Sequence, residues 1–311
     1  MVGVGEAGEE LALEGVEASV GGGPTKQALQ RYAAALAHGR PIVAEVVSSM
    51  SLDALAACLT SGATLAPKER AAVRAAFSAD PVGALAIFCP YGTGGGDPWC
   101  PVGGRGCPWR PAASAAEAVL TAFDPLTASM KSLVAALSKR ALAVLARKEA
   151  GQWQLLYLVE VGGAKGESWR LQPLVAGPPA TAPELSPAAR KAGWALDADL
   201  AAFYAVHDGF GIWGDGAWGV DAVLPAGQLE VLPAVIGHAN NAAKTPIIAK
   251  DGLLAFFIDS VGNRRGLYRQ VSGGLVYKKA VEWDRFTKEV GMLQGPLKVI
   301  QAQLVAQLAG R

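Results

Sequence analysis

Residues 197–209 have the sequence DADLAAFYAVHDG, and this stretch decides the class of the C-terminal half of the chain. Asp197 or Asp199 is a favourable N-cap for a helix, because an aspartate oxygen accepts a hydrogen bond from a backbone N–H of the first turn. Gly209 is typical of the residue that follows a helix end. The residues between them that share one helix face are Leu200, Phe203, Tyr204 and His207. The stretch therefore predicts a short helix with one buried, mostly aromatic face.

Short extended runs follow this helix, each bounded by turn-forming residues. The predicted strands are residues 218–224, 253–259, 266–270 and 275–279. Two closing helices are predicted over residues 283–292 and 296–308, and an earlier one opens at Ser186 and Pro187. These elements make residues 183–311 an α+β domain with a mostly antiparallel sheet flanked by helices.

The segment before this domain contains two extended runs followed by a proline-rich stretch. Residues 152–161 and 167–175 are extended runs joined by a glycine-rich turn, which predicts a hairpin. Five prolines lie between positions 173 and 187, and proline disfavours both helices and sheet ladders. We therefore predict a hairpin and a Pro-rich linker over residues 151–182, with a domain boundary in the linker.

The N-terminal part is predicted to be helical after a loose start. Residues 1–24 hold five Glu and many Gly, which predicts a flexible acidic and Gly-rich arm. Residues 25–150 are predicted to form a helical domain, with helices that begin near positions 26, 51, 67 and 81 and a longer one over 126–145. A loop rich in Gly, Pro and Cys interrupts this domain at 89–112, where the density of helix breakers excludes regular structure.

Composition limits the classes of function. The length of 311 residues predicts about two domains, and a formal net charge of +1 removes the electrostatic argument for direct nucleic-acid binding. No run reaches the roughly 18 apolar residues of a membrane span, and five Glu precede the first basic residue, so neither membrane insertion nor a secretory leader is expected. Four Cys in a chain of this length favour a reducing, cytoplasmic location.

The order of motifs over residues 183–292 resembles the SUKH superfamily. The helix of residues 197–209 is similar to the family's opening signature, a capped helix with an aromatic pair, although Leu196-Asp197 stands where Leu-Pro is usual and Asp208-Gly209 where Asn-Gly is usual. The later motifs that resemble the family are the strand and turn of residues 253–263, the pair Val276-Tyr277 and the aromatic helix that begins at Trp283. Residues 1–180 lie outside the resemblance.

The resemblance implies a binding module without catalytic residues. SUKH domains are mostly bacterial immunity proteins of polymorphic toxin systems, which neutralise a cognate toxin by protein binding. The expected function is therefore immunity by occlusion of the toxin's active site, in an oligomeric state that the sequence does not indicate. The alternative is a scaffold or assembly component of a bacterial secretion, phage-like or compartment system.

A glycine-rich segment after the predicted helix is the candidate partner-binding site. Aromatic residues on such a loop are costly to leave in water, and binding hot spots favour Trp within a polar rim. The candidate partner-binding residues are Asp208, Phe210, Trp213, Asp215 and Trp218. The alternative interpretation is that Trp213 and Trp218 fill the core of their own domain.

Two chemical alternatives compete with binding. The first is catalysis by His207 as a general base, with Asp208 as the acid that orients it. Adjacent residues on a helix point about 100° apart, so these two are poorly placed to act together. The sequence also contains no hydrolase, P-loop or metalloprotease motif. We therefore expect no enzyme activity and no cofactor. Cys89, Cys100 and Cys107 are weak candidate zinc ligands, since they lack the paired Cys spacing of zinc ribbons. A disulfide between two of them, or three free thiols, is also compatible with the sequence.

Overall fold

The computed structural model divides the chain into two compact units. Unit 1 comprises residues 1–99 and 160–171, and unit 2 comprises residues 100–159 and 172–311. The described residues are 45, 50, 65–88, 99–104, 106–149, 151–162, 169–180, 183–213, 218–232, 248–259, 263–270, 275–283, 290–292 and 295–309. The predicted arm of residues 1–24 and the predicted helices that begin near positions 26 and 51 lie outside them.

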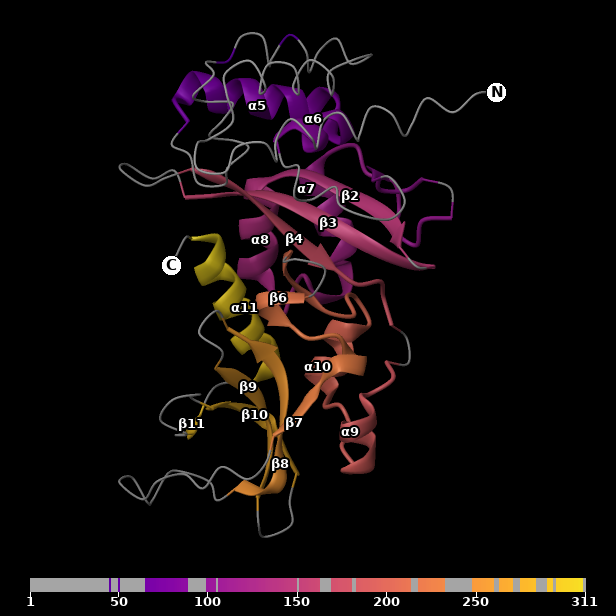
Figure 1. The fold of residues 1–311 in the computed structure, drawn as a ribbon, viewed down its shortest axis with the longest axis vertical. Helices are drawn as coiled ribbons and strands as arrows, with labels where there is room; N and C mark the ends of the chain where they lie inside the picture. Colours follow the sequence, from indigo (N-terminus) through magenta and orange to yellow (C-terminus); the bar gives the residue numbers. More distant parts are fainter. Residues whose placement is uncertain are drawn as a thin grey trace, which may run out of the picture. The chain divides into compact units, whose positions relative to one another are not determined.

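Two consecutive helices form the described helical part of unit 1, α5 (Pro67–Ala79) and α6 (Pro81–Phe88) (Figure 1). Both begin at proline, as predicted, because the first helical position needs no N–H donor. Asp80 caps α6, since its Oδ1 accepts a hydrogen bond of 2.9 Å from the Gly83 N–H. The buried rings of Phe77 and Phe88 lie 6.1 Å apart and join the two helices.

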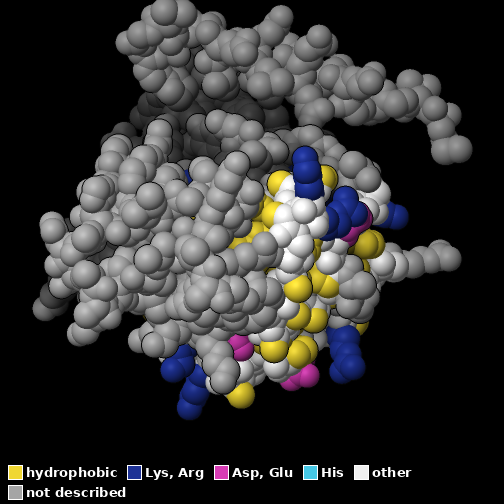
Figure 2. Space-filling view, turned by 90° about the horizontal axis from the view of Figure 1, so that it is seen from below, with side chains coloured by type: hydrophobic (Ala, Val, Ile, Leu, Met, Phe, Trp, Pro, Cys, Tyr) yellow, Lys and Arg dark blue, Asp and Glu magenta, His cyan; other side chains and the backbone are white. Residues whose placement is uncertain are grey.

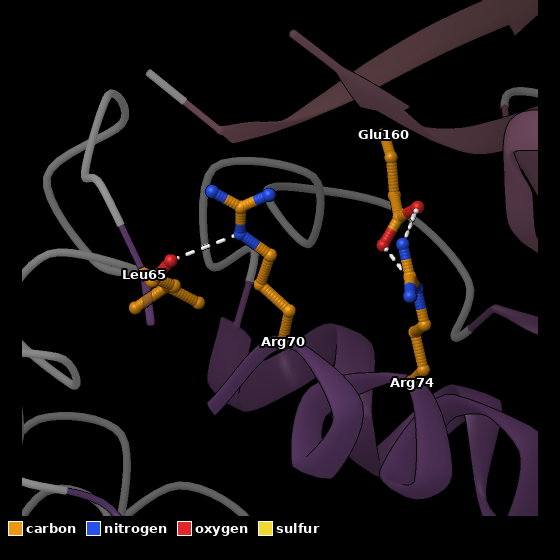
Figure 3. A network of polar contacts seen from close by, with 4 residues as sticks. All are labelled: Leu65, Arg70, Arg74 and Glu160. Carbon is orange, nitrogen blue, oxygen red and sulfur yellow. Dashed lines mark hydrogen bonds and ion pairs between the residues drawn. The ribbon is translucent and has the colours of Figure 1, made fainter. Parts of the chain in front are cut away.

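An ion pair ties α5 to the residue that opens the 160–171 segment of the same unit. Figure 3 shows the Arg74 guanidinium donating to both oxygens of the Glu160 carboxylate, each at 2.7 Å. One turn earlier, Arg70 Nε donates to the Leu65 carbonyl at 2.9 Å. The arginine face of α5 is therefore engaged in contacts within its own unit.

The described strands form one 11-stranded sheet, and most of it belongs to unit 2. Their bounds are β1 (Cys100–Pro101), β2 (Ala141–Glu149), β3 (Gln152–Val161), β4 (Arg170–Ala176), β5 (Phe210–Trp213), β6 (Trp218–Val223), β7 (Glu230–Leu232), β8 (Ile248–Ile258), β9 (Arg264–Gln270), β10 (Leu275–Trp283) and β11 (Val290–Met292). The order is β1-β2-β3-β4-β5-β6-β8-β9-β10-β11, with β7 paired to β8. The ladders β1–β2, β2–β3, β4–β5, β5–β6 and β8–β9 are antiparallel, so the predicted α+β class with a mostly antiparallel sheet is confirmed.

The helices of unit 2 lie beside this sheet (Figure 1). They are α7 (Ala115–Ala122), α8 (Lys131–Arg140), α9 (Pro187–Lys191), α10 (Ala198–Tyr204) and α11 (Pro296–Leu308), with single 3₁₀ turns η2 (Asp124–Leu126) and η3 (Ala226–Gln228). The start of α8 has no cap from its own N-cap residue, Met130. Instead, Gln301 Oε1 of α11 accepts hydrogen bonds from the N–H groups of Ser132 at 2.9 Å and Leu133 at 3.3 Å. The C-terminal helix thus completes a helix far earlier in the chain.

The predicted long helix over 126–145 is too long at both ends, because Asp124–Leu126 form a 3₁₀ turn and the α-helix begins only at Lys131 and ends at Arg140. The chain turns there into β2, whose residue Val144 pairs with Tyr157 of β3. The side chains from Ala143 to Ala146 are all buried, and a strand covered on both faces is a continuous apolar run. Such a run satisfies helical spacing and strand spacing equally, so periodicity alone did not distinguish them.

The region predicted as a hairpin and linker, residues 151–182, also differs from the prediction. The hairpin strands exist as β3 and β4, which are neighbours in the sheet. The predicted linker, however, contains the end of β4, and Leu174 pairs with Ile212 of β5. Pro173 is compatible with this strand because the ladder to β5 begins one residue later. Segments on both sides of the predicted boundary therefore share one sheet.

The predicted helix over 283–292 is wrong at both ends. Trp283 ends β10 and pairs with Val290 of β11, so the chain returns antiparallel instead of continuing as a helix. Residues 284–289 lie outside the described residues. The other closing helix is confirmed as α11.

The surface of the described part carries scattered basic groups. Arg190 and Lys191 are exposed in the last turn of α9, where cations favour the negative end of the helix dipole, and Arg190 pairs with Glu184. In the view of Figure 2, Lys and Arg side chains are separated by hydrophobic and neutral groups. None of the helices among the residues described here is long and apolar enough to cross a membrane.

Candidate functional site

The short helix α10 and the strand β5 that follows it position the candidate binding residues. Asp197 caps α10, as predicted, and its Oδ1 accepts a hydrogen bond of 2.8 Å from the Leu200 N–H. Burial raises the pKa of the Asp197 carboxyl to about 6. Phe203 and Tyr204 on this helix are fully buried, so the predicted aromatic face is confirmed. Tyr204 Oη donates to the Leu224 carbonyl at 2.9 Å and thereby ties α10 to the end of β6.

His207 lies inside the domain and makes two internal contacts. Its Nε2 is 2.9 Å from the Tyr157 hydroxyl, and its Nδ1 is 3.4 Å from the Gly177 carbonyl. A carbonyl oxygen only accepts, so Nδ1 carries the ring proton and Nε2 accepts from the tyrosine. Burial lowers the pKa of His207 to about 3, which keeps the ring neutral at physiological pH. A neutral histidine with both nitrogens occupied is a structural group, so the general-base alternative has no support from its geometry.

An aromatic cluster surrounds this histidine. The ring of Phe123 lies edge-on at 4.7 Å from the His207 ring, and Phe210 lies at 5.8 Å. Phe210 also contacts Tyr157 at 5.5 Å between ring centroids. Because Phe210 is fully buried, it does not form part of a contact surface, and its predicted partner-binding role is corrected to a core role.

Asp208 is a half-buried connector at the base of β5. Its Oδ1 accepts a hydrogen bond of 2.7 Å from the Ala226 N–H, and its own N–H donates to the Pro178 carbonyl at 3.0 Å. A methyl group added at Gly177 would lie 2.0 Å from the Asp208 carbonyl oxygen, so that approach requires glycine. Burial raises the pKa of the Asp208 carboxyl. The predicted binding residue therefore holds β5, the end of β4 and the η3 turn together.

The remaining candidates lie at the far end of the β5–β6 hairpin. Trp213, the last residue of β5, pairs directly with Trp218, the first residue of β6. Residues that are directly opposite in an antiparallel ladder belong to the same face of the sheet. Asp215 lies outside the described residues, between these two strands. The structure therefore brings the two tryptophan positions together and separates them from the buried base at Asp208 and Phe210.

The cysteine loop is described in part. Cys100 and Cys107 are both free and partly exposed, whereas Cys89 lies outside the described residues. In the portion of the chain that the structure describes, no group of three or more His, Cys, Asp and Glu side chains is placed to hold a metal ion. The geometry of the described cysteines thus adds nothing to the weak zinc hypothesis.

Tyr157 and Phe123 are the important residues that sequence reasoning missed. Tyr157 lies in the middle of β3, within a run of buried residues from Leu155 to Val161. A buried tyrosine hydroxyl normally requires a hydrogen-bond partner, and this requirement was the available signal. The partner itself was not predictable, because His207 lies in a separate segment that only the fold brings near.

Comparison of the chain with protein-family models, with curated proteins and with solved structures found no match. The resemblance to the SUKH superfamily therefore stays a prediction.

Proposed function

We propose that this chain is a non-enzymatic binding protein that neutralises a cognate bacterial toxin by occluding its active site. The proposed contact residues are Trp213 and Trp218, which pair in the β5–β6 ladder, and Asp215, which lies between them in the sequence. The observation that carries the proposal is the direct pairing of Trp213 with Trp218. Trp213 and Trp218 occupy opposite positions in the ladder, and tryptophan is enriched among binding hot spots.

The base of the hairpin supports this assignment. Asp208 accepts from the Ala226 N–H and donates its own N–H to Pro178, and Phe210 is fully buried in the aromatic cluster. A binding segment held on a fixed base loses less conformational entropy when the partner is bound. The division between a buried base and a tryptophan-bearing end therefore suits recognition.

The state of His207 supports binding over catalysis at this position. Both ring nitrogens are engaged within the domain, and its low pKa keeps it neutral. A general base needs a free nitrogen within reach of a substrate proton. The nearest acid in sequence, Asp208, is occupied by a backbone N–H.

The proposal is tested by purification of the tagged chain from its host, identification of bound proteins, and expression of each one in cells with and without this chain. We expect one retained protein that stops growth alone and is neutralised when the wild-type chain is co-expressed. The Trp213→Ala/Trp218→Ala double variant should fail to neutralise it. Leu120→Ala is the control, since Leu120 is an exposed hydrophobic residue of α7 with 48% exposure.

Two results would contradict the proposal. A multi-subunit assembly without any toxic member would favour the scaffold alternative. Full neutralisation by the double variant would remove the hairpin end from the interface. Because the tryptophan changes can unfold the domain, thermal unfolding is measured in parallel, and Asp215→Lys provides a second variant that acts by charge.

A further inference from the structure

The edge strand β1 and the turn after it bring two cysteines to one place. Cys100 pairs with Ala146 of β2, and its Sγ donates to the Ala146 carbonyl at 3.2 Å. The chain then reverses at Gly103 and Gly106, whose positive φ angles of 90° and 78° favour glycine. The reversal directs the following residue, Cys107, back toward the strand.

Gly104 is the point that both cysteines contact. The Cys107 N–H donates to the Gly104 carbonyl at 3.0 Å, which closes the turn. A methyl group placed on Gly104 would lie 3.7 Å from Cys100 Sγ. Cys100 Sγ therefore lies near the Gly104 backbone to which Cys107 is hydrogen-bonded.

The Cys107 thiol is also close enough to influence the ionisation of Cys100, and both thiols remain accessible. Burial raises the pKa of Cys100, and the negative charge of a Cys107 thiolate raises it further. Both residues are partly exposed to solvent. Access and proximity are the two requirements for thiol–disulfide exchange between a pair.

We propose that Cys100 and Cys107 form a reversible disulfide by exchange with a low-molecular-weight disulfide such as oxidised glutathione. Cys107 attacks first, because the Cys100 thiol holds its proton in the bond to Ala146. The Cys107 thiolate forms a bond to one glutathione sulfur and releases the other as a thiolate. Deprotonated Cys100 then attacks Cys107 Sγ and releases the second glutathione. Two thiols are oxidised, one glutathione disulfide is reduced, and the two protons are taken up by the released thiolates.

The bridge joins β1 to the end of its own turn. β1 pairs with β2 at two positions, Cys100 with Ala146 and Pro101 with Leu145. A covalent link from Cys100 across the turn restricts the chain on both sides of this short ladder. The oxidised form should therefore hold the β1 edge of the sheet more firmly, while the β5–β6 hairpin is unchanged.

Peptide mapping of the full-length protein tests the proposal. The protein is incubated with oxidised glutathione, alkylated and digested with trypsin without reduction. Trypsin cleaves after Arg105, between the two cysteines, so peptides 75–105 and 106–131 separate unless a disulfide joins them. We expect one linked mass that divides into the two peptides after treatment with dithiothreitol. Separate peptides, each alkylated or carrying glutathione, would overturn the proposal without any variant.

Matched variants assign the link, because peptide 75–105 also contains Cys89. Cys89→Ser should retain the linked mass. Cys100→Ser should lose it and leave a glutathione adduct on Cys107. A link that survives in Cys100→Ser and disappears in Cys89→Ser, or one that joins Cys107 to Cys58, would contradict the assignment.

Discussion

The Tyr157–His207 pair in unit 2 and the Arg74–Glu160 pair in unit 1 both join residues far apart in the sequence, but they differ in charge and in access to water. Tyr157 and His207 are both fully buried and neutral. Arg74 and Glu160 form a bidentate ion pair in which the Arg74 side chain is 54% exposed. The hydrogen bond to Glu160 raises the pKa of Arg74, so the guanidinium remains charged.

The difference shows that burial determines whether a contact is neutral or charged. A charge at the centre of the aromatic cluster would be costly, so the histidine is held neutral and each of its nitrogens has a partner. The Arg74–Glu160 ion pair lies near water and can therefore remain charged, but solvent weakens the attraction between its two charges. We therefore expect perturbations of the two pairs to differ in size and in their response to pH and salt.

The largest effect is expected for His207→Ala. The change removes a ring that contacts Phe123 and Phe210, and it leaves the buried Tyr157 hydroxyl without its acceptor. Together the cavity and the orphaned hydroxyl should lower the free energy of unfolding by about 3 kcal/mol, as measured by urea denaturation. Tyr157→Phe removes the hydroxyl alone and should cost about 1–2 kcal/mol. A loss below about 1 kcal/mol for His207→Ala would mean that the cluster does not support the hairpin base.

The pH dependence of His207 is the second expected effect. Its pKa is about 3 in the folded chain and 6.5 ordinarily, so between these values the unfolded chain binds more protons. The contribution of neutral His207 to stability is therefore complete above pH 6.5 and falls as the pH is lowered toward 3. The effect of pH on stability through Asp197 has the opposite sign. The pKa of Asp197 is raised to about 6, so here the folded chain binds the extra proton.

Comparison with His207→Gln isolates the histidine, because both proteins retain Asp197. The stability advantage of the wild-type chain should shrink by about 1 kcal/mol for each pH unit between roughly pH 6 and 4. Chemical denaturation across this range measures it. An advantage that stays constant would show that His207 is already protonated, or exposed, in the folded state.

An intermediate effect is expected for a neutral contact near the surface. Gln301 caps α8 through the N–H groups of Ser132 and Leu133. Gln301→Ala should lower stability by about 1 kcal/mol, as for other lost helix caps, and it should do so independently of salt. Gln303→Ala on the same helix is the control. Equal effects of the two variants would indicate loss of helix packing and not loss of the cap.

The smallest effect is expected for the ion pair. A double-mutant cycle with Arg74→Ala and Glu160→Ala should give a coupling energy of about 1 kcal/mol or less. Because salt screens exposed charges, the coupling should decrease between low salt and about 1 M sodium chloride. A larger coupling that is insensitive to salt would place the Arg74–Glu160 contact in the same class as the buried pair.

Local signals in the sequence predicted the starts of α5, α9 and α10. Asp197, Ser186 and Pro67 act through hydrogen bonds or φ values within one turn, so their effect can be derived without knowledge of the fold. The strands near residues 253 and 266 were also predicted, because apolar runs between turns have few alternatives. β2 was missed because burial on both faces removes the alternation that identifies a strand.

The candidate site was less predictable, because its contacts join segments that are distant in the sequence. Asp208 and Phe210 were assigned to a contact surface because their neighbours in sequence are glycines. Their true partners, the Ala226 N–H and the rings of Phe123 and Tyr157, come from other segments of the fold. Trp213 and Trp218 are paired because β5 and β6 form a hairpin. The same hairpin separates these two residues from Asp208 and Phe210 at its base.

The central claim is that Trp213, Asp215 and Trp218 of the β5–β6 hairpin bind a toxic partner while the base of the hairpin is structural. The most direct measurement is the affinity of the purified partner for the wild-type chain, for Trp213→Ala/Trp218→Ala and for Leu120→Ala, by calorimetry on folded proteins. We predict a loss of at least about 100-fold for the double variant, as for removal of hot-spot residues, and no change for Leu120→Ala. Equal affinity of all three proteins would contradict the account.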